Sequence, residues 1–454
     1  MPEVAIPQLV ELLKSTLGVA LTRPSVTNML IIALGWVMAD EGHAITSAIV
    51  GVGANGKRHH EAFHRFFSRG TWSPDRLGYW LLVRLQPHLL DSNTLCVAID
   101  DTVSHRKGAQ VFGIGSHLDA VRSTKAMRVF AFGHCWVVLC ATVQVPFSHR
   151  VWALPLLFRL YRTHKDCDES GGEYRKKTEL AREMLDLLCQ WTVEKGWRIQ
   201  VSADSAYCND TVTRGLPERV VLFGSMRPDA VLTEAPPRRV RATSGGRPRK
   251  RGDRLPKPEQ IAHDDSSPWQ SLKVTLYGGT RVVRYKTLKA QWYRACGVGL
   301  LRIVIVDTSA NGKVPLRVFF CTDATLSVRN VLQGYSQRWS IEVFFREAKQ
   351  LLGFGEAPVR KPEAVLRVAP FTGMLYTVLV LWFLDGVYQT PLATPPVRPW
   401  YTHKRGLAFT DILRTARRSL ASVEVLVPSK GNGNLRNQSP AIRTRAKARV
   451  LMAA

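Results

Sequence analysis

The middle of the sequence alternates short apolar segments with one amphipathic helix, and this order constrains the fold. Residues 95–99 (Leu-Cys-Val-Ala-Ile) form a continuous apolar run, typical of a central strand covered on both faces. Residues 129–145 predict one or two further strands, 178–191 an amphipathic helix that Gly196 ends, and 197–203 another strand. A strand–strand–helix–strand order indicates an α/β layer.

Acidic residues follow two of these predicted strands. Asp100 and Asp101 come just past the first, and Asp204 comes just past the last. Such residues are most often turn or helix-cap residues when taken singly. Phosphodiester chemistry, however, needs an activated nucleophile and a stabilised leaving oxygen, which two Mg²⁺ ions about 3.5–4 Å apart supply. Because Mg²⁺ prefers carboxylate oxygens and keeps several waters, three acids suffice to hold it.

A third acid lies on the helix predicted over residues 335–352. Tyr335, Arg338, Glu342 and Lys349 follow one another at offsets of 3, 4 and 7, which places them on one face of an α-helix. A carboxylate between Arg and Lys can hold a metal while the cations contact phosphates. The alternative is an ordinary salt-bridged face exposed to solvent.

The charge of the chain indicates a polyanionic partner. Lys and Arg number 63 against 36 Asp and Glu, which gives a formal net charge of +27. DNA, RNA or an anionic membrane would balance it; the alternative is a basic protein from a GC-rich genome. The most apolar run, 370–384, is short of the roughly 20 residues that span a bilayer, and predicts a buried helix. The eight cysteines show no zinc spacing and favour a reduced compartment.

Basic segments lie outside the α/β layer. Residues 1–90 predict helices, and 46–60 resemble a helix, a Gly-rich turn and a basic helix start that contains Lys57 and Arg58. This stretch is either a helix-turn-helix that contacts DNA or a packing domain with a basic surface. Residues 238–257 hold nine Arg or Lys, among them Arg249, Lys250 and Arg251, and one acid; the tail 430–449 holds six and no acid.

The helix residues match a known signature without a gap: Tyr, two residues, Arg, three residues, Glu, six residues, Lys. Here the sequence resembles the DDE transposases of bacterial insertion sequences that carry this Tyr-Arg-Glu-Lys signature. Asp100-Asp101-Thr102 is similar to the family's first aspartate motif. Asp204 with Tyr207 is similar to the second, an Asp followed three residues on by an aromatic.

The first metal ligand is either Asp100 or Asp101. RNase H-like enzymes commonly show Asp-x-Thr/Ser at this point, and only Asp100 stands in that relation to Thr102. A strand alternates its faces, so both side chains cannot point the same way. We favour Asp100 and keep Asp101 as the alternative.

The resemblance implies an α/β, RNase H-like fold, with a mixed five-stranded sheet flanked by helices and a β-rich insertion before the glutamate helix. The expected regions are a helical DNA-binding region (1–90), the first part of the catalytic core (91–224), the insertion with its basic loop (225–325), the second part of the core (326–390) and a basic C-terminal region (391–454).

The resemblance also implies a cut-and-paste transposase. Asp100, Asp204 and Glu342 would hold two Mg²⁺ ions, with Mn²⁺ tolerated, and Tyr335, Arg338 and Lys349 would contact phosphates near the cut end. The expected partners are double-stranded DNA with terminal inverted repeats, target DNA and a second copy in the synaptic complex, in the cytoplasm at the nucleoid. The alternatives are an inactive transposase-derived DNA-binding protein and an RNase H-fold nuclease without strand transfer.

Overall fold

The computed structural model describes most of the chain. The described residues are 2–39, 42–89, 93–108, 110–119, 122–124, 126–237, 249–308, 316–396, 399–400 and 406–422. The helices are α1 (Pro2–Thr16), α2 (Arg23–Met38), α3 (Ile45–Gly51), α4 (Glu61–Ser68), α5 (Pro74–Leu85), α6 (His164–Ser170), α7 (Lys177–Thr192), α8 (Asp210–Thr213), α9 (Pro258–His263), α10 (Tyr293–Cys296), α11 (Val328–Ser336), α12 (Trp339–Leu352), α13 (Pro362–Leu384) and α14 (Phe409–Ser422).

Within the described ranges, ten strands form one mixed sheet. They are β1 (Thr94–His105), β2 (Gly115–Leu118), β3 (Phe130–Gln144), β4 (Val151–Tyr161), β5 (Arg198–Ala203), β6 (Val220–Met226), β7 (Gln270–Leu276), β8 (Gly279–Gln291), β9 (Leu300–Asp307) and β10 (Leu316–Cys321). Their spatial order is β2-β3-β1-β5-β6-β10-β9-β8-β7, with β4 also paired to β3.

Five of these strands form the RNase H-like core. β1 is antiparallel to β3 and parallel to β5, β5 is parallel to β6, and β4 is antiparallel to β3. Helix α7 covers one face, and α12 packs on β1 and β4. The expected α/β fold, a mixed sheet with flanking helices, is confirmed.

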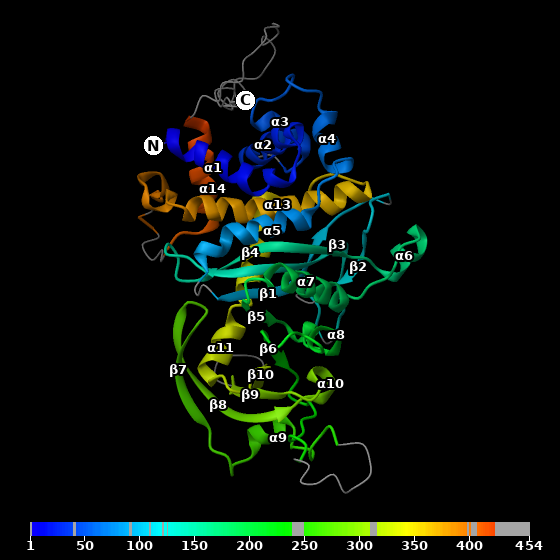
Figure 1. Ribbon diagram of the computed structural model, residues 1–454, viewed down its shortest axis with the longest axis vertical. Coiled ribbons are helices and arrows are strands. Elements are labelled where there is room, and N and C mark those ends of the chain that lie inside the picture. The colour runs from blue at the N-terminus through cyan, green and yellow to red at the C-terminus, as the bar shows by residue number, and fades with distance from the viewer. Residues whose placement is uncertain are drawn as a thin grey trace.

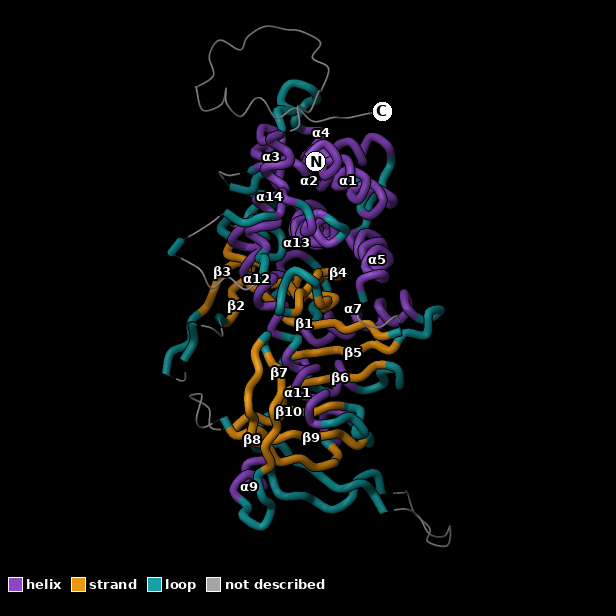
Figure 2. The backbone as a smooth tube through the Cα atoms, turned by 90° about the vertical axis from the view of Figure 1, so that its left-hand side faces the viewer, coloured by secondary structure: helices purple, strands orange, loops and turns teal. Residues whose placement is uncertain are grey.

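The strands expected in the insertion are present and extend the same sheet. β10 pairs antiparallel with β6, and β9, β8 and β7 follow outward. In Figure 1 these strands form one end of the molecule, the core strands lie in the middle, and the helices α1–α4 form the other end. Figure 2 shows the same succession from the side.

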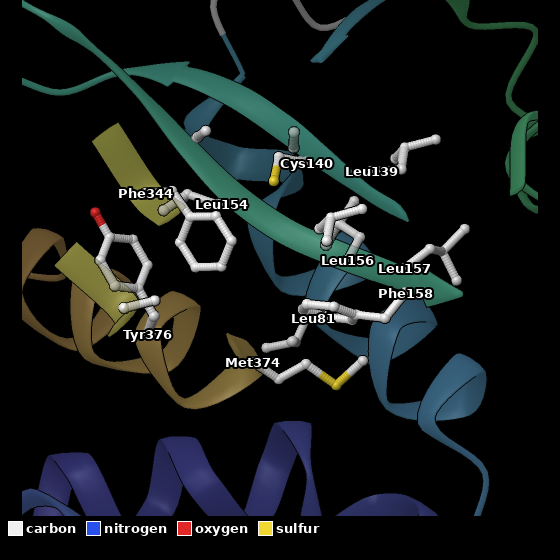
Figure 3. Close-up of a cluster of buried hydrophobic side chains, with 14 of the residues drawn as sticks. Leu81, Leu139, Cys140, Leu154, Leu156, Leu157, Phe158, Phe344, Met374 and Tyr376 are labelled. Atoms are coloured by element: carbon white, nitrogen blue, oxygen red, sulfur yellow. The ribbon is translucent and has the colours of Figure 1, made fainter. Parts of the chain in front are cut away.

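Helix α13 connects the helical end to the sheet. It packs against β4, α4 and α5, and its length and composition alone would allow it to cross a membrane, but 89% of its most apolar window is buried. Figure 3 shows Met374 and Tyr376 of this helix beside Leu81 of α5, Phe344 of α12 and side chains of β3 and β4. The expectation of a buried core helix is confirmed.

Three element boundaries differ from those predicted. β1 does not end before Asp100 but continues to His105, because β3 pairs with it as far as Gly133. The apolar helix starts at Pro362, not at residue 370, since proline is favoured in the first helical turn. The helix predicted over 335–352 is two helices, because Gln337 and Arg338 make tighter hydrogen bonds to the third residue before them.

The buried His134 on β3 makes the fold sensitive to acid. Its Nε2 donates to the Phe112 carbonyl at 2.9 Å, and burial lowers its pKa to about 4. Between pH 6.5 and 4 the unfolded chain therefore binds more protons at this residue, and His134 should contribute a loss of about 3 kcal/mol of stability as pH drops through this window.

Denaturant unfolding of the wild type and of His134→Gln across this window measures the effect. Glutamine can donate to the same carbonyl but does not titrate, so between pH 6.5 and 4 the variant should lose about 3 kcal/mol less stability than the wild type. Two other groups contribute in both proteins: His117, whose pKa burial also lowers, acts in the same direction, and Asp100, whose pKa burial raises to about 7, acts in the opposite direction. An unchanged slope in His134→Gln would contradict the assignment.

Candidate active site

Asp100 and Asp204 lie at neighbouring positions of two parallel strands. Ile99 of β1 is in register with Ala203 of β5, and the two aspartates are the next residues. Asp204 keeps an extended backbone (φ −70°, ψ 164°) and caps a short helical turn by accepting from the Ser205 amide. Since registered residues of parallel strands point to the same face, both carboxylates lie on one side of the sheet.

Arg338 brings Glu342 to the same place. Its guanidinium donates to Asp100 at 2.7 Å and to Glu342 at 2.6 Å. The Arg338 side chain is only 14% exposed, against 16% for Asp100 and 36% for Glu342. The start of α12 is thereby held against the middle of β1, and two acids far apart in the sequence meet on either side of one cation.

The charge balance of this site favours a bound cation. Burial raises the pKa of Asp100 to about 7, the nearby Arg338 opposes this shift, and the charges of Asp101 and Asp204 add to it. Carboxylate oxygens are also the donors that Mg²⁺ and Mn²⁺ prefer. In donor chemistry the three acids therefore fit a divalent ion. In this structure, however, Asp100 and Glu342 contact the Arg338 guanidinium. Within the described part of the chain, no three His, Cys, Asp or Glu side chains are grouped to hold a metal.

Asp101 points to the opposite face of the sheet. Its carboxylate accepts from Lys177 of α7 at 2.6 Å, from the Tyr207 hydroxyl at 2.7 Å and from the Cys135 thiol at 3.4 Å. Strand alternation thus separates the two neighbouring aspartates. Asp101 joins β1 to α7 and to the turn after Asp204, whereas Asp100 faces Arg338.

The other two signature residues are partly enclosed. Lys349 donates to the Thr102 hydroxyl at 2.6 Å and to the Val103 carbonyl at 2.7 Å, which fastens the end of α12 to β1. Tyr335 belongs to α11 and is 8% exposed. Its ring packs tilted against the Phe319 ring, with the centroids 4.6 Å apart, and its hydroxyl lies 3.4 Å from the Ser225 hydroxyl. Tyr335 therefore supports the sheet beside the site and presents little surface to a ligand.

The basic residues of the N-terminal region and of the basic loop, also expected to contact DNA, lie far from these acids in the sequence and are exposed. Lys57 and Arg58 occupy the connection between α3 and α4, where Arg58 donates to Asn28 at 2.9 Å. That connection spans 52–60, longer than the three- to four-residue turn of a helix-turn-helix.

Arg249, Lys250 and Arg251, in the described part of the basic loop, are also exposed. Arg249 pairs with Asp253 at 3.3 Å, and Arg251 lies over the Tyr293 ring at 4.6 Å. Residues 238–248 and the basic tail 430–449 lie outside the described residues.

Several residues that stabilise the elements around the site were not predicted from the sequence as site residues. Lys177 opens an ordinary amphipathic helix and carries no motif, so nothing in the sequence marks it. Tyr207 gave a signal, as the aromatic of the second aspartate motif, and the structure gives it a contact: its hydroxyl binds Asp101. Glu347, an acid that no pattern selects, is buried between Arg150 and Tyr376 at 2.7 Å from each.

The Asp101 network should matter for stability. Asp101→Asn removes the charge that compensates Lys177 and should lower the free energy of unfolding by about 2–3 kcal/mol. Denaturant unfolding measures this loss. The double variant Asp101→Asn/Lys177→Met should recover part of it, because it leaves no uncompensated cation. No recovery would contradict the pairing.

The family of the chain follows from its match to a family model. No curated protein matches the chain. The model of the DDE superfamily endonuclease family matches residues 21–296, a range that contains Asp100 and Asp204 and ends before Glu342. Endonucleases of this superfamily act on DNA and generally use divalent metals. More than half of the chain is matched, and its sheet carries the first two acids on adjacent parallel strands; the chain belongs to the DDE superfamily endonucleases.

Proposed function

We propose that this endonuclease is a transposase that cuts and joins the ends of an insertion sequence, from the group with the Tyr-Arg-Glu-Lys signature. The observation that carries the proposal is the convergence on one guanidinium of Asp100, from the middle of β1, and Glu342, from the start of α12. Asp204 on the neighbouring strand supplies the third acid.

Asp100, Asp204 and Glu342 would hold two Mg²⁺ or Mn²⁺ ions, which when bound activate a water or a 3′-hydroxyl and stabilise the leaving oxygen. Arg338 places positive charge between Asp100 and Glu342, where a scissile phosphate must lie, and Lys349 adds a cation further along β1, at Thr102. Asp101, Lys177 and Tyr207 join β1 to α7 and to the turn after Asp204 on the opposite face of the sheet, and so stabilise the fold.

The charge of the chain supports the proposed substrates. A net charge of +27 fits duplex DNA with terminal inverted repeats and a target duplex. The exposed Lys57, Arg58, Arg249, Lys250 and Arg251 would contribute phosphate contacts, so affinity should fall steeply with salt. Two ends must be cut in concert, and we place the enzyme as a homodimer in the synaptic complex, at the cytoplasmic nucleoid.

A plasmid that carries the genomic DNA from both sides of the gene tests the proposal. The full chain with Mg²⁺ should cut at inverted repeats and, with a target plasmid, yield joined products. Cutting without joining would indicate a nuclease of the same fold. Binding without metal-dependent cutting would indicate a DNA-binding protein in which Arg338 permanently neutralises the acids.

A further inference from the structure

Large apolar side chains are exposed together on the hairpin of β2 and β3. Leu118, Phe130 and Phe132 are 50, 59 and 51% exposed, and Met127 in the connection is 61% exposed. Leu118 is paired with Phe130 in the antiparallel register, and directly opposed residues point to the same face. Leu118, Phe130 and Phe132 therefore form one exposed surface, which we name the phenylalanine platform.

The platform lies on the same face of the sheet as Asp100. Asp100 is paired with Val138 of β3, and every second residue of a strand shares a face. Phe132 and Phe130 lie six and eight positions before Val138 on β3. Both are even numbers of residues, so both side chains lie on the Asp100 face. Phe132 is six positions from Val138, and six strand residues extend about 20 Å. This distance equals about six nucleotides of one DNA strand.

The back of the hairpin already supplies its folding contacts. His117 and Ala131, which alternate with the platform residues, are 4 and 5% exposed, and His117 lies 3.1 Å from the Gly133 carbonyl. A strand with one buried face ordinarily carries polar residues on the other. Two phenylalanines on the open face are thus not needed to hold the hairpin, and such a patch marks an interaction site.

The charge around the platform selects its ligand. The described residues between 105 and 132 include four basic residues and one acid, Asp119; the basic residues are Arg106, Lys107, Arg122 and Arg128. A second copy of a chain with net charge +27 would be repelled by this hairpin. A single nucleic-acid strand combines the opposite charge with flat bases that stack on aromatic rings.

We propose that the phenylalanine platform stacks unpaired bases of a DNA strand that extends from the active site. The inference rests on the proposed function, because it takes DNA to be the molecule handled at Asp100. Bases in a duplex are already stacked on one another, so the platform favours DNA whose strands have separated.

Binding of a single-stranded oligodeoxythymidylate of about 16 nucleotides, labelled with 2-aminopurine, tests the platform. The full chain is used with Asp204→Ala, so that nothing is cut. Phe130→Ala/Phe132→Ala should weaken binding about 5- to 100-fold and relieve the quenching of the label, while affinity for the matched duplex stays the same. The salt slope should also stay the same, because the phosphate contacts remain.

Matched variants separate stacking from other effects. Phe130→Trp/Phe132→Trp should bind like the wild type, and Phe130→Leu/Phe132→Leu should bind like the alanine variant. Val282→Ala, at a 68% exposed position of the insertion, should change nothing. Thermal unfolding checks that each variant is folded.

Three results would overturn the inference: unchanged single-strand binding in the alanine variant, full binding in the leucine variant, or conversion of a DNA-free dimer to monomer by the alanine changes. The last would identify an interface between copies. If the wild type cuts ends but the platform variants bind normally, only this inference fails. If the wild type cuts nothing but the variants lose single-strand binding, the platform stands and the proposed function fails.

Discussion

Asp100→Asn should abolish metal-dependent cleavage of the element's ends, by at least about a thousandfold, while DNA binding remains. Asparagine fills the same space but has lost the negative charge, and metal-assisted catalysis supplies several kcal/mol, with each 1.36 kcal/mol worth tenfold in rate. Arg338 would keep its contact with Glu342. Gel analysis of end cleavage and filter binding of the same DNA measure the two effects separately.

Asp101→Asn is the matched control for this prediction, since it makes the same chemical change one residue further along β1. Its carboxylate faces Lys177 and Tyr207, so the variant should lose stability and keep cleavage below its melting temperature. The opposite pattern, in which Asp101→Asn abolishes cleavage and Asp100→Asn does not, would show that the two roles are reversed.

Glu347→Leu should lower the free energy of unfolding by about 3–4 kcal/mol. Glu347 is 8% exposed as a residue, and its carboxylate accepts from Arg150 and Tyr376, each at 2.7 Å. Its removal leaves a half-buried guanidinium and a fully buried hydroxyl without their acceptor, and breaking such a pair costs more than the pair contributes. Denaturant unfolding followed by tryptophan fluorescence gives the value.

Glu342→Gln, five residues earlier on the same helix, is the matched control. Glu342 is 36% exposed, and a pair at that exposure contributes about 1 kcal/mol or less. Glu342→Gln should therefore stay stable and lose cleavage, whereas Glu347→Leu should lose stability. Equal stability losses in the two variants would contradict this division of α12 into a site face and a core face.

Local sequence patterns predicted much of the fold. The apolar run before Asp100, the amphipathic helix from Lys177 and the strand before Asp204 were predictable, because each depends on side-chain periodicity within a few residues. The ends of β1 and α13 were not, since pairing with β3 and burial under the helical end extend them beyond their most apolar residues. The break at Gln337 and Arg338 was also invisible, because both residues are compatible with a continuous helix.

The sequence by itself determined the kinds of element, their order, the excess of positive charge and the set of acids from which a site could be built, because these depend only on residue type and spacing. Only the tertiary structure separated Asp100 from Asp101, joined the insertion to the main sheet through β10 and β6, and left Phe130 and Phe132 exposed on the Asp100 face. Each of these depends on which distant segment packs against a given face, and no local spacing records that partner.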